Sequence, residues 1–142
     1  MIESVNSSNS VDPREISPAL WAYLGDALYE LYAREYLLNV KRLKTTGALH
    51  REAIKLVKAE AQAKIVHAIT QELSAEENDI LRRGRNHKTG HIPTHTDPVT
   101  YRHSTAWEGL LGYLYLAEKK ERMKELIFRG LEILEEATLP KG

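Results

Sequence analysis

Residues 19–38 read ALWAYLGDALYELYAREYLL. Apolar side chains recur along this stretch at every third or fourth position, which predicts a helix of the core with one apolar face. The positions are Leu20, Leu24, Ala27, Leu28, Leu31 and Leu38. Gly25 and Asp26 interrupt them. An interior helical glycine costs about 1 kcal/mol relative to alanine, so it indicates close approach by another segment. An aspartate there is either exposed to solvent, or buried with a base or a cation as its partner.

The composition is that of a single ordinary domain. The chain has 142 residues, enough for a substantial core. It contains no cysteine, which excludes disulfides and cysteine-ligated metal sites. The first residues lack the basic and apolar regions of a signal peptide, and no run of about 18 apolar residues could span a membrane. We therefore expect a cytoplasmic protein that has no membrane partner.

Charge is distributed unevenly, although 20 basic and 20 acidic residues cancel. Residues 41–64 carry seven Lys or Arg against two acids, and residues 82–103 carry five against one. These two blocks also contain five of the six histidines. Such blocks are compatible with an anionic partner, or they are solvated surface.

Helical signals dominate the rest of the chain and predict an all-α domain of about six helices. Ser17 and Asp97 are each followed by proline, the pattern of an N-cap with proline at the first helical position. Ser74-Ala75-Glu76-Glu77 is a capping box. A break at 57–59 is left open. The expected helices span about residues 18–38, 48–57, 59–71, 75–81, 98–119 and 121–137.

Three segments are expected outside the helices. Residues 1–16 are rich in Ser and Asn and predict a flexible N-terminal segment, and 139–142 form a short tail. Residues 82–98, RRGRNHKTGHIPTHTDP, contain two glycines, two prolines and few apolar groups, which predicts a long basic loop. The single domain then covers 17–138.

The helix expected from Pro98 repeats the combination of an acid with glycines. It is apolar on nearly all sides, yet it contains Glu108 beside Gly109, and then Gly112. Two helices that pack at their glycines would bring Asp26 and Glu108 within reach. Two carboxylates in a core repel unless a proton or cation lies between them, and Mg²⁺ suits such a pair. The alternative is that each acid pairs with a base or faces solvent.

Both acid-bearing blocks resemble one enzyme family. Residues 24–28, LGDAL, followed by Glu30 and Leu31, resemble the LGDAVLE core of the ribonuclease III catalytic domain. Residues 106–116, AWEGLLGYLYL, resemble that family's second block, and the two blocks occur in the family's order. The helix count and chain length also fit, so the resemblance covers nearly the whole chain.

Two departures indicate a particular branch of that family. Ribonuclease III carries further acids where this chain has Ala22 and Thr105, and a double-stranded-RNA-binding domain that this chain lacks. The Mini-ribonuclease III subfamily has only the two acids. Three stretches of this chain are similar to motifs of that subfamily: WAYLGDALYE (21–30), RGRNHKTG (83–90) and TYRHSTAWEGLLGYLYL (100–116). The chain is therefore identified as a member of the Mini-ribonuclease III subfamily.

The resemblance implies a specific activity. Asp26 and Glu108 would be the catalytic and metal-binding acids of a Mg²⁺-dependent endoribonuclease, with Mn²⁺ as an alternative ion. The family works as a homodimer whose two sites cut the two strands of an RNA duplex. The expected substrate is the stem flanking the large-subunit (23S) ribosomal RNA precursor, and no DNA partner is expected.

Basic residues near the second block are the candidate RNA contacts, because duplex RNA is recognised through phosphates, 2′-hydroxyls and shape. They are Arg82, Arg83, Arg85, Asn86, Lys88 and Arg102. His87, His91 and His95 recur every four residues, but Gly90 and Pro93 argue against a continuous helix that would make them a metal site.

Two other classes of function stay open at this point. A non-catalytic, ribosome-associated RNA-binding protein with a degenerate ribonuclease III fold would explain the missing acids but not the retained Asp26 and Glu108. A helical adaptor for other proteins fits the amphipathic C-terminal helix but leaves both acids unexplained.

Overall fold

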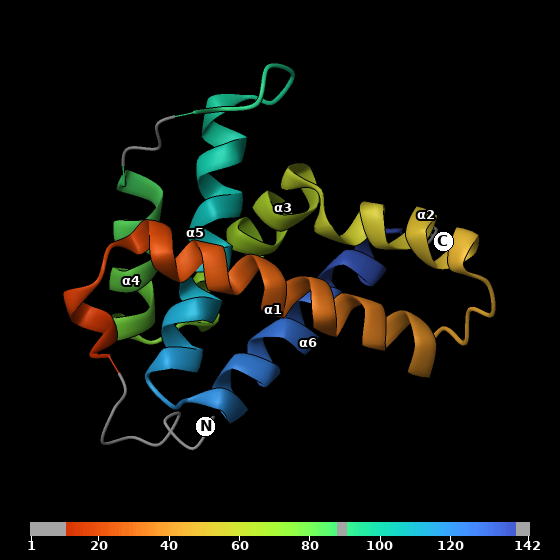
Figure 1. Ribbon diagram of the computed structural model, residues 1–142, viewed down its shortest axis with the longest axis horizontal. Coiled ribbons are helices and arrows are strands. Elements are labelled where there is room, and N and C mark those ends of the chain that lie inside the picture. Colours follow the sequence, from red (N-terminus) through yellow and green to blue (C-terminus); the bar gives the residue numbers. More distant parts are fainter. Residues whose placement is uncertain (1–10, 88–90, 139–142) are drawn as a thin grey trace, which may run out of the picture.

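The computed structural model of the protein describes residues 11–87 and 91–138, and these ranges contain helices and connections without strands. The all-α class is therefore confirmed. In Figure 1, α5 runs through the middle of the molecule, α1 crosses in front of it, and α4 lies on the opposite side from α2. The helices are α1 (Pro18–Asn39), α2 (Thr46–Val57), α3 (Ala59–Ile69), α4 (Ala75–Asn86), α5 (Pro98–Leu116) and α6 (Lys120–Thr138).

The predicted helix starts are confirmed by their caps. The Ser17 side chain accepts a hydrogen bond from the Ala19 N–H, and the Asp97 carboxylate accepts one from the Thr100 N–H. Both bonds of the Ser74–Glu77 capping box are present. These caps satisfy backbone donors that a helix leaves unpaired at its first turn.

Helices α2 and α3 are separate. Lys58 has extended backbone angles (φ −64°, ψ 156°) and ends α2 while it begins α3. The break that the sequence left open therefore lies at Lys58. Helix α2 begins at Thr46, two residues before the predicted position, because the Thr45 side chain accepts from the Ala48 N–H and caps it there.

Helix α4 continues into the segment predicted to be a loop, which corrects that prediction. The helix extends to Asn86, so residues 82–86 are helical. Packing against α5 and α1 compensates for the missing apolar residues: Gly84 lies against Ala106, and the Arg83 guanidinium lies 5.1 Å from the centre of the Trp21 ring. Residues 91–97 do form a connection, which leads into α5.

The N-terminal prediction also needs correction. Part of the segment 1–16 is structured, since a 3₁₀ helix covers Pro13–Glu15. The Pro13 carbonyl accepts a hydrogen bond of 2.7 Å from the indole N–H of Trp21, a fully buried side chain. Satisfying that indole explains why the chain before α1 is held against the domain. The expectations for 1–10 and 139–142 lie outside the described residues.

The main chains of α1 and α5 touch at two glycines. A Cβ placed on Gly25 would lie 1.6 Å from the carbonyl oxygen of Glu108, and one placed on Gly112 would lie 1.9 Å from that of Trp21. Each helix thus offers a glycine to the main chain of the other, one turn apart. The close approach predicted from Gly25 is confirmed, and α1 and α5 form the most extensive helix pair.

The apolar face predicted for the core is the wrong face of α1. The buried side chains are Trp21, Ala22, Tyr29, Ala33 and Leu37, which share the side that carries Gly25. The leucine face remains largely exposed, with Leu31 58% and the neighbouring Tyr23 83% accessible. Only the glycine side permits main chains to touch, so it faces α5, and the leucines are left on the surface.

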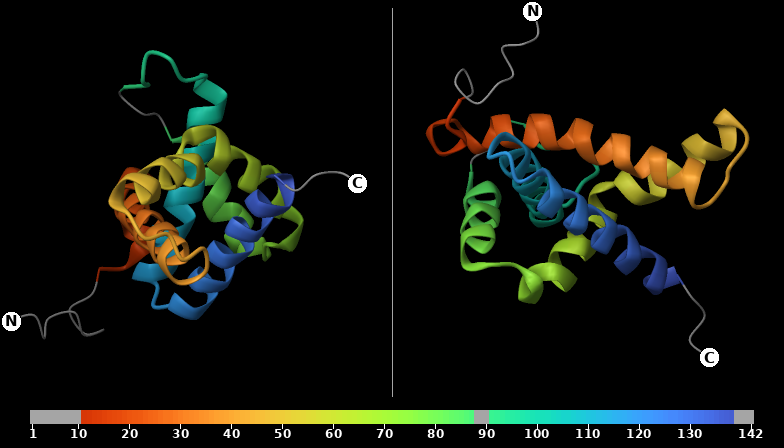
Figure 2. Two further views of the ribbon diagram at one scale, coloured as in Figure 1. Left: turned by 90° about the vertical axis from the view of Figure 1, so that its right-hand side faces the viewer. Right: turned by 90° about the horizontal axis from the view of Figure 1, so that it is seen from below.

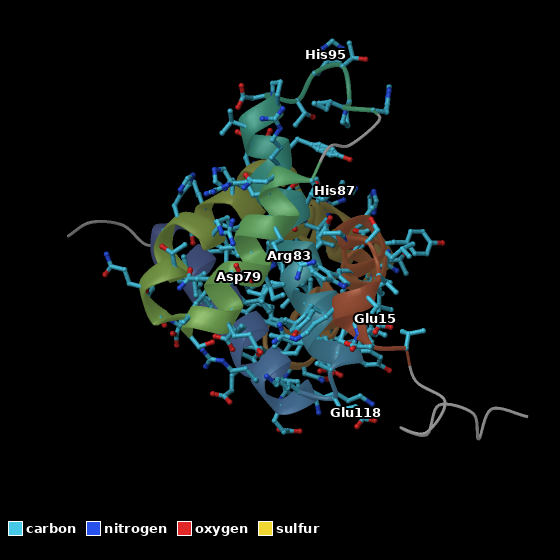
Figure 3. The ribbon with its side chains drawn as sticks, turned by 90° about the vertical axis from the view of Figure 1, so that its left-hand side faces the viewer. Glu15, Asp79, Arg83, His87, His95 and Glu118 are labelled. Atoms are coloured by element: carbon cyan, nitrogen blue, oxygen red, sulfur yellow. The ribbon has the colours of Figure 1, made fainter. Side chains whose placement is uncertain are left out.

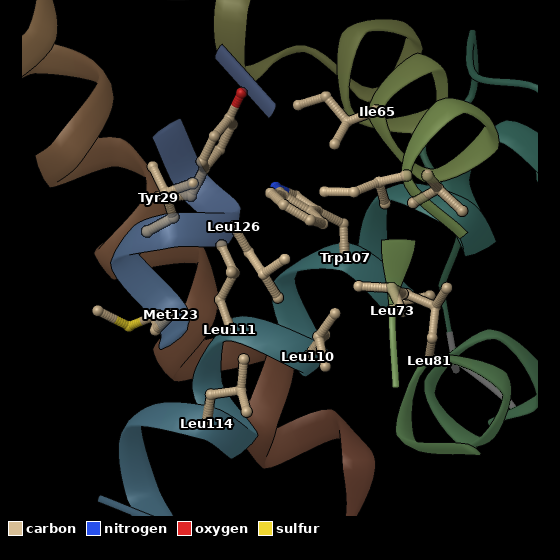
Figure 4. Packing of buried hydrophobic residues seen from close by; sticks show 14 of the residues in the cluster. Tyr29, Ile65, Leu73, Leu81, Trp107, Leu110, Leu111, Leu114, Met123 and Leu126 are labelled. Atoms are coloured by element: carbon tan, nitrogen blue, oxygen red, sulfur yellow. The ribbon is translucent and has the colours of Figure 1, made fainter. Parts of the chain in front are cut away.

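The core fills the space between α5 and the surrounding helices. Trp107 and Tyr29 meet edge to face with ring centres 6.1 Å apart, and leucines from α5 and α6 pack below them (Figure 4). Seen from below, α6 crosses the bundle (Figure 2). The buried Glu77 binds Arg122 of α6 through hydrogen bonds of 2.8 and 3.0 Å. Within the described ranges, no helix has the length and apolarity of a membrane span.

Gly112→Ala tests the backbone contact without touching an acid. The added methyl group would overlap the Trp21 carbonyl and force α1 away from α5, so we expect a loss of at least about 3 kcal/mol in the free energy of unfolding. Urea and thermal unfolding measure it. Gly47→Ala is the matched control, because a Cβ there meets only the end of the Arg51 side chain at 3.5 Å and improves helix propensity. Equal midpoints for the two variants would contradict the contact.

Candidate active site

Asp26 and Glu108 come together where α1 meets α5. The Glu108 carbonyl rests on Gly25, the residue before Asp26, so the main-chain contact brings the two acids to one place. Their surroundings differ: Asp26 is exposed, and Glu108 is partly buried. The site therefore combines one carboxylate open to solvent with one held in the protein.

The pKa of Glu108 is raised from its usual 4.5 to about 8, mainly by burial and then by the negative charge of Asp26. A hydrogen bond from Gln62 opposes this rise, while the charge of Glu30 adds to it. Without a cation, Glu108 is thus protonated at neutral pH. Two neighbouring carboxylates repel each other unless a proton or a cation lies between them. A cation can therefore replace the proton of Glu108, which makes this pair of acids a candidate cation site.

Gln62, on α3, holds Glu108 in place. Its amide nitrogen donates to the Glu108 carboxylate at 3.1 Å and to the Val57 carbonyl at 2.7 Å. Because both partners are acceptors, the NH₂ group must face them, and the amide oxygen is left buried with no donor among the described residues. Gln62 is only 3% accessible. The end of α2 and Glu108 are thus joined through one side chain.

Two further residues of α1, Tyr29 and Glu30, influence the charge of Glu108 or are influenced by it. Glu30 lies one turn after Asp26, pairs with Arg34 at 3.0 Å, and contributes its charge to Glu108. The Tyr29 hydroxyl donates to the Leu56 carbonyl at 2.8 Å. Burial raises the pKa of Tyr29 above its usual value, and the charge of Glu108 adds to the effect. Tyr29 therefore stays neutral and acts as a hydrogen-bond donor.

Gln62 and Glu30 were not among the site residues predicted from the sequence. Glu30 could have been found from its spacing, since residues four apart share a helix face. Gln62 offers a weaker signal, a polar residue among the apolar positions of α3. Its partner is 46 residues away, and only the tertiary fold brings them together.

Ala22 and Thr105 add no ligand. Ala22 is buried against the neighbouring helix, and the Thr105 hydroxyl donates to the Tyr101 carbonyl of its own helix at 2.9 Å. The donor set in the described ranges therefore consists of the two carboxylates, Asp26 and Glu108. No three His, Asp or Glu side chains in the described ranges converge as a metal cluster. This set fits Mg²⁺, which takes one or two protein carboxylates and keeps several waters.

The residues predicted to contact RNA separate into two groups. Arg82 pairs with Asp79 on the surface of α4, and Arg83 lies over Trp21. Arg85, Asn86 and Arg102 instead line one pocket of about 370 Å³ between the end of α4 and the start of α5. Lys88 lies outside the described residues.

Histidines at the end of α4 are dispersed. Figure 3 places Asp79, Arg83 and His87 in succession along this part of the chain, with His95 at the far end of the loop that leads to α5. His91 and His95 are exposed.

Comparison with known proteins gives the family. The ribonuclease III domain matches residues 20–119, a range that contains both acids. The chain belongs to the ribonuclease III family.

Its relatives identify the branch. The chain is 44% identical over 121 residues to the Mini-ribonuclease 3 of Thermoanaerobacter sp. (strain X514), covering 85% of this chain and 84% of that protein. It is 43% identical over 124 residues to the Mini-ribonuclease 3 of Symbiobacterium thermophilum, covering 87% and 95%. A crystal structure of a Fusobacterium nucleatum protein superposes with a TM-score of 0.75 at 32% identity, covering 87% of this chain and 98% of that one. The protein is an endoribonuclease of the Mini-III type.

The raised pKa of Glu108 predicts how stability depends on pH in metal-free protein. Between pH 4.5 and about pH 8, Glu108 is protonated in the folded state but ionised in the unfolded state. The free energy of unfolding therefore falls as the pH rises through this range. Glu108→Gln removes the titration and should stabilise the metal-free protein at pH 8 by at least about 1.4 kcal/mol, the equivalent of one pKa unit.

Urea unfolding at several pH values in a chelator measures this effect. Glu60→Gln is the control, since Glu60 is exposed and has no ion-pair partner in the described part of the chain. Identical pH slopes for wild type and Glu108→Gln would show that Glu108 titrates normally.

Proposed function

We propose that the protein is a Mg²⁺-dependent endoribonuclease that cleaves double-stranded RNA, with Asp26 and Glu108 as the catalytic, metal-binding acids and Mn²⁺ as an alternative ion. The observation that carries this proposal is the acid pair at the α1–α5 contact, where the pKa of Glu108 is raised to about 8 next to an exposed carboxylate. It lies within the residues that match the ribonuclease III domain.

Each residue has a role in this proposal. Asp26 faces solvent, so it can meet an RNA strand that lies on the surface. Glu108 gives up its proton when a cation arrives, and Gln62 keeps its carboxylate in position. When bound, Mg²⁺ supplies an activated water and neutralises charge on the scissile phosphate. Glu30 adds negative charge near Glu108, which favours a bound cation at the acid pair.

The substrate follows from the family resemblance. We propose the duplex stem that flanks the 23S ribosomal RNA precursor, cut in the cytoplasm. The pairing of two strands in such a stem suits an enzyme with two sites, and the described chain contributes one. Basic side chains near the start of α5 support a polyanionic substrate, because phosphates dominate the affinity for nucleic acids.

The exposed face of α1 supports the homodimer. Leu20, Tyr23, Leu31 and Leu38 are all more than half accessible and follow one side of the helix that carries Asp26. Contiguous exposed apolar side chains of this kind mark association surfaces in proteins. A second copy packed on this face would cover the leucines and bring the two acid sites to the same side of the assembly.

Cleavage of a short RNA duplex tests the activity. With Mg²⁺ the wild type should cut both strands, whereas Asp26→Asn and Glu108→Gln should each cut at least about 100-fold more slowly, because a charge needed in the transition state is gone. Glu60→Gln is the matched control and should cut normally. Binding of the duplex without cutting by the wild type would favour the non-catalytic RNA-binding alternative, and neither binding nor cutting would favour an adaptor.

Leu31→Arg tests the dimer. A charge at the centre of the leucine face should prevent its burial, since an unpaired buried charge costs several kcal/mol, and sedimentation should then give the mass of one chain. Phe128→Arg, at a similarly exposed apolar position on α6, should leave the mass of the wild type unchanged. A dimeric Leu31→Arg variant would place the interface elsewhere.

A further inference from the structure

The pocket between the end of α4 and the start of α5 is lined by groups that donate hydrogen bonds. The pocket has a volume of about 370 Å³. It lies against α5, the helix that also carries Glu108. No carboxylate lines it. The lining residues are Arg85, Asn86, His87, Val99, Arg102 and His103.

The two arginines of this pocket have no acidic partner in the described ranges. This separates them from most other arginines of the chain: Arg82 pairs with Asp79, Arg122 with Glu77, and Arg129 with Glu72. The nearest polar contact of Arg85 is the Asn86 side chain at 3.5 Å. Two guanidinium groups therefore share a pocket without an anion to balance them.

His103 is unsatisfied in the same place. Its ring meets that of His67, from α3, with centres 4.6 Å apart at 62°. Its Nδ1 atom is buried and has no hydrogen-bond partner among the residues that the structure describes. A buried polar atom without a partner costs about 1–3 kcal/mol, so a feature of this kind needs an explanation. His103 also lines the pocket, so an anion held there can accept a hydrogen bond from its imidazolium ring.

We propose that this pocket holds one phosphate group of the RNA backbone, gripped by Arg85 and Arg102 and by His103 in its protonated form. Arginine forks match the oxygens of a phosphate in pairs, which suits two guanidinium groups around one pocket. The inference rests on the proposed function and extends it, since it assigns a contact with the RNA backbone to His103, which the sequence patterns left without a role.

The position of the pocket suits a substrate contact near the acids. His103 precedes Glu108 by five residues on α5, which at 1.5 Å per residue is about 8 Å along the helix axis. A phosphate held there would fix the register of one RNA strand relative to Glu108. It would carry no sequence information by itself, because phosphate contacts position a nucleic acid and base contacts specify it.

Protonation of His103 makes this grip depend on pH. In the free protein, burial lowers the pKa of His103, and the charges of His67 and Arg85 lower it further, so the ring is neutral near pH 7. The other groups that face it from α4 and α5 are His87 and Arg102, which also disfavour a positive charge. A bound phosphate reverses this effect. Binding then takes up a proton, so affinity rises as pH falls.

Binding of a short RNA duplex in a chelator, which prevents cutting, tests the proposal by fluorescence anisotropy at several salt concentrations. Arg102→Gln should weaken binding about tenfold and reduce the salt slope by about one, since one phosphate contact is lost. Lys120→Gln is the control, because Lys120 is an exposed cation at the start of α6. It should leave both quantities unchanged.

The histidine is tested by the pH profile between about pH 6 and about pH 8, where histidine titrates. Wild-type affinity should rise toward the acidic end at constant ionic strength. His103→Phe, which keeps a ring against His67, should flatten that rise, and His67→Phe provides a second variant that removes a competing charge and leaves Nδ1 of His103 in place. Circular dichroism verifies that each variant is folded.

The outcomes separate this inference from the proposed function. If the wild type binds and cuts duplex RNA but Arg102→Gln and His103→Phe match it in affinity, salt slope and pH profile, the phosphate pocket is overturned and the nuclease stands. If the wild type neither binds nor cuts duplex RNA, both are overturned. Loss of affinity in Arg102→Gln with a flattened profile in His103→Phe supports the pocket.

Discussion

The main-chain contact between Gly25 and the carbonyl of Glu108 is the constraint on which the rest of this structure depends. It sets the closest approach of α1 and α5, and its counterpart one turn away, Gly112 against Trp21, fixes the pair in a single register. Asp26 follows Gly25 directly, so the separation of the acids is a property of the backbone. Burial of Glu108 is the main cause of its pKa of about 8, and the enforced proximity of the Asp26 charge adds to it.

Local signals in the sequence predicted the helices well. Caps at Ser17, Ser74 and Asp97 gave the starts of three helices, because capping involves residues close in the chain. The end of α4 could not be predicted in this way. Residues 82–86 are polar and contain a glycine, and they stay helical because Gly84 fits against Ala106 on another helix. Tertiary packing overrides a weak local preference there.

The orientation of α1 was predicted wrongly for a related reason. The leucine face has the stronger periodicity, whereas the buried face mixes glycine, alanine and aromatic residues. A periodic apolar pattern indicates that a helix face is buried. It does not indicate whether that face packs against the same chain or against another one. The two acids were predicted because their glycine neighbours and the family motifs identify them. Gln62, Glu30 and the His67–His103 pair were not, since each acts through a partner on another helix or another turn.

The placement of the acids on α1 and α5 has a consequence for how heat inactivates this protein. Functional groups are commonly carried by loops that open long before the whole domain unfolds. Here they sit on the most closely packed pair of helices, so the acid site has no melting transition of its own. Loss of its geometry requires separation of α1 from α5, and irreversible inactivation should coincide with global unfolding.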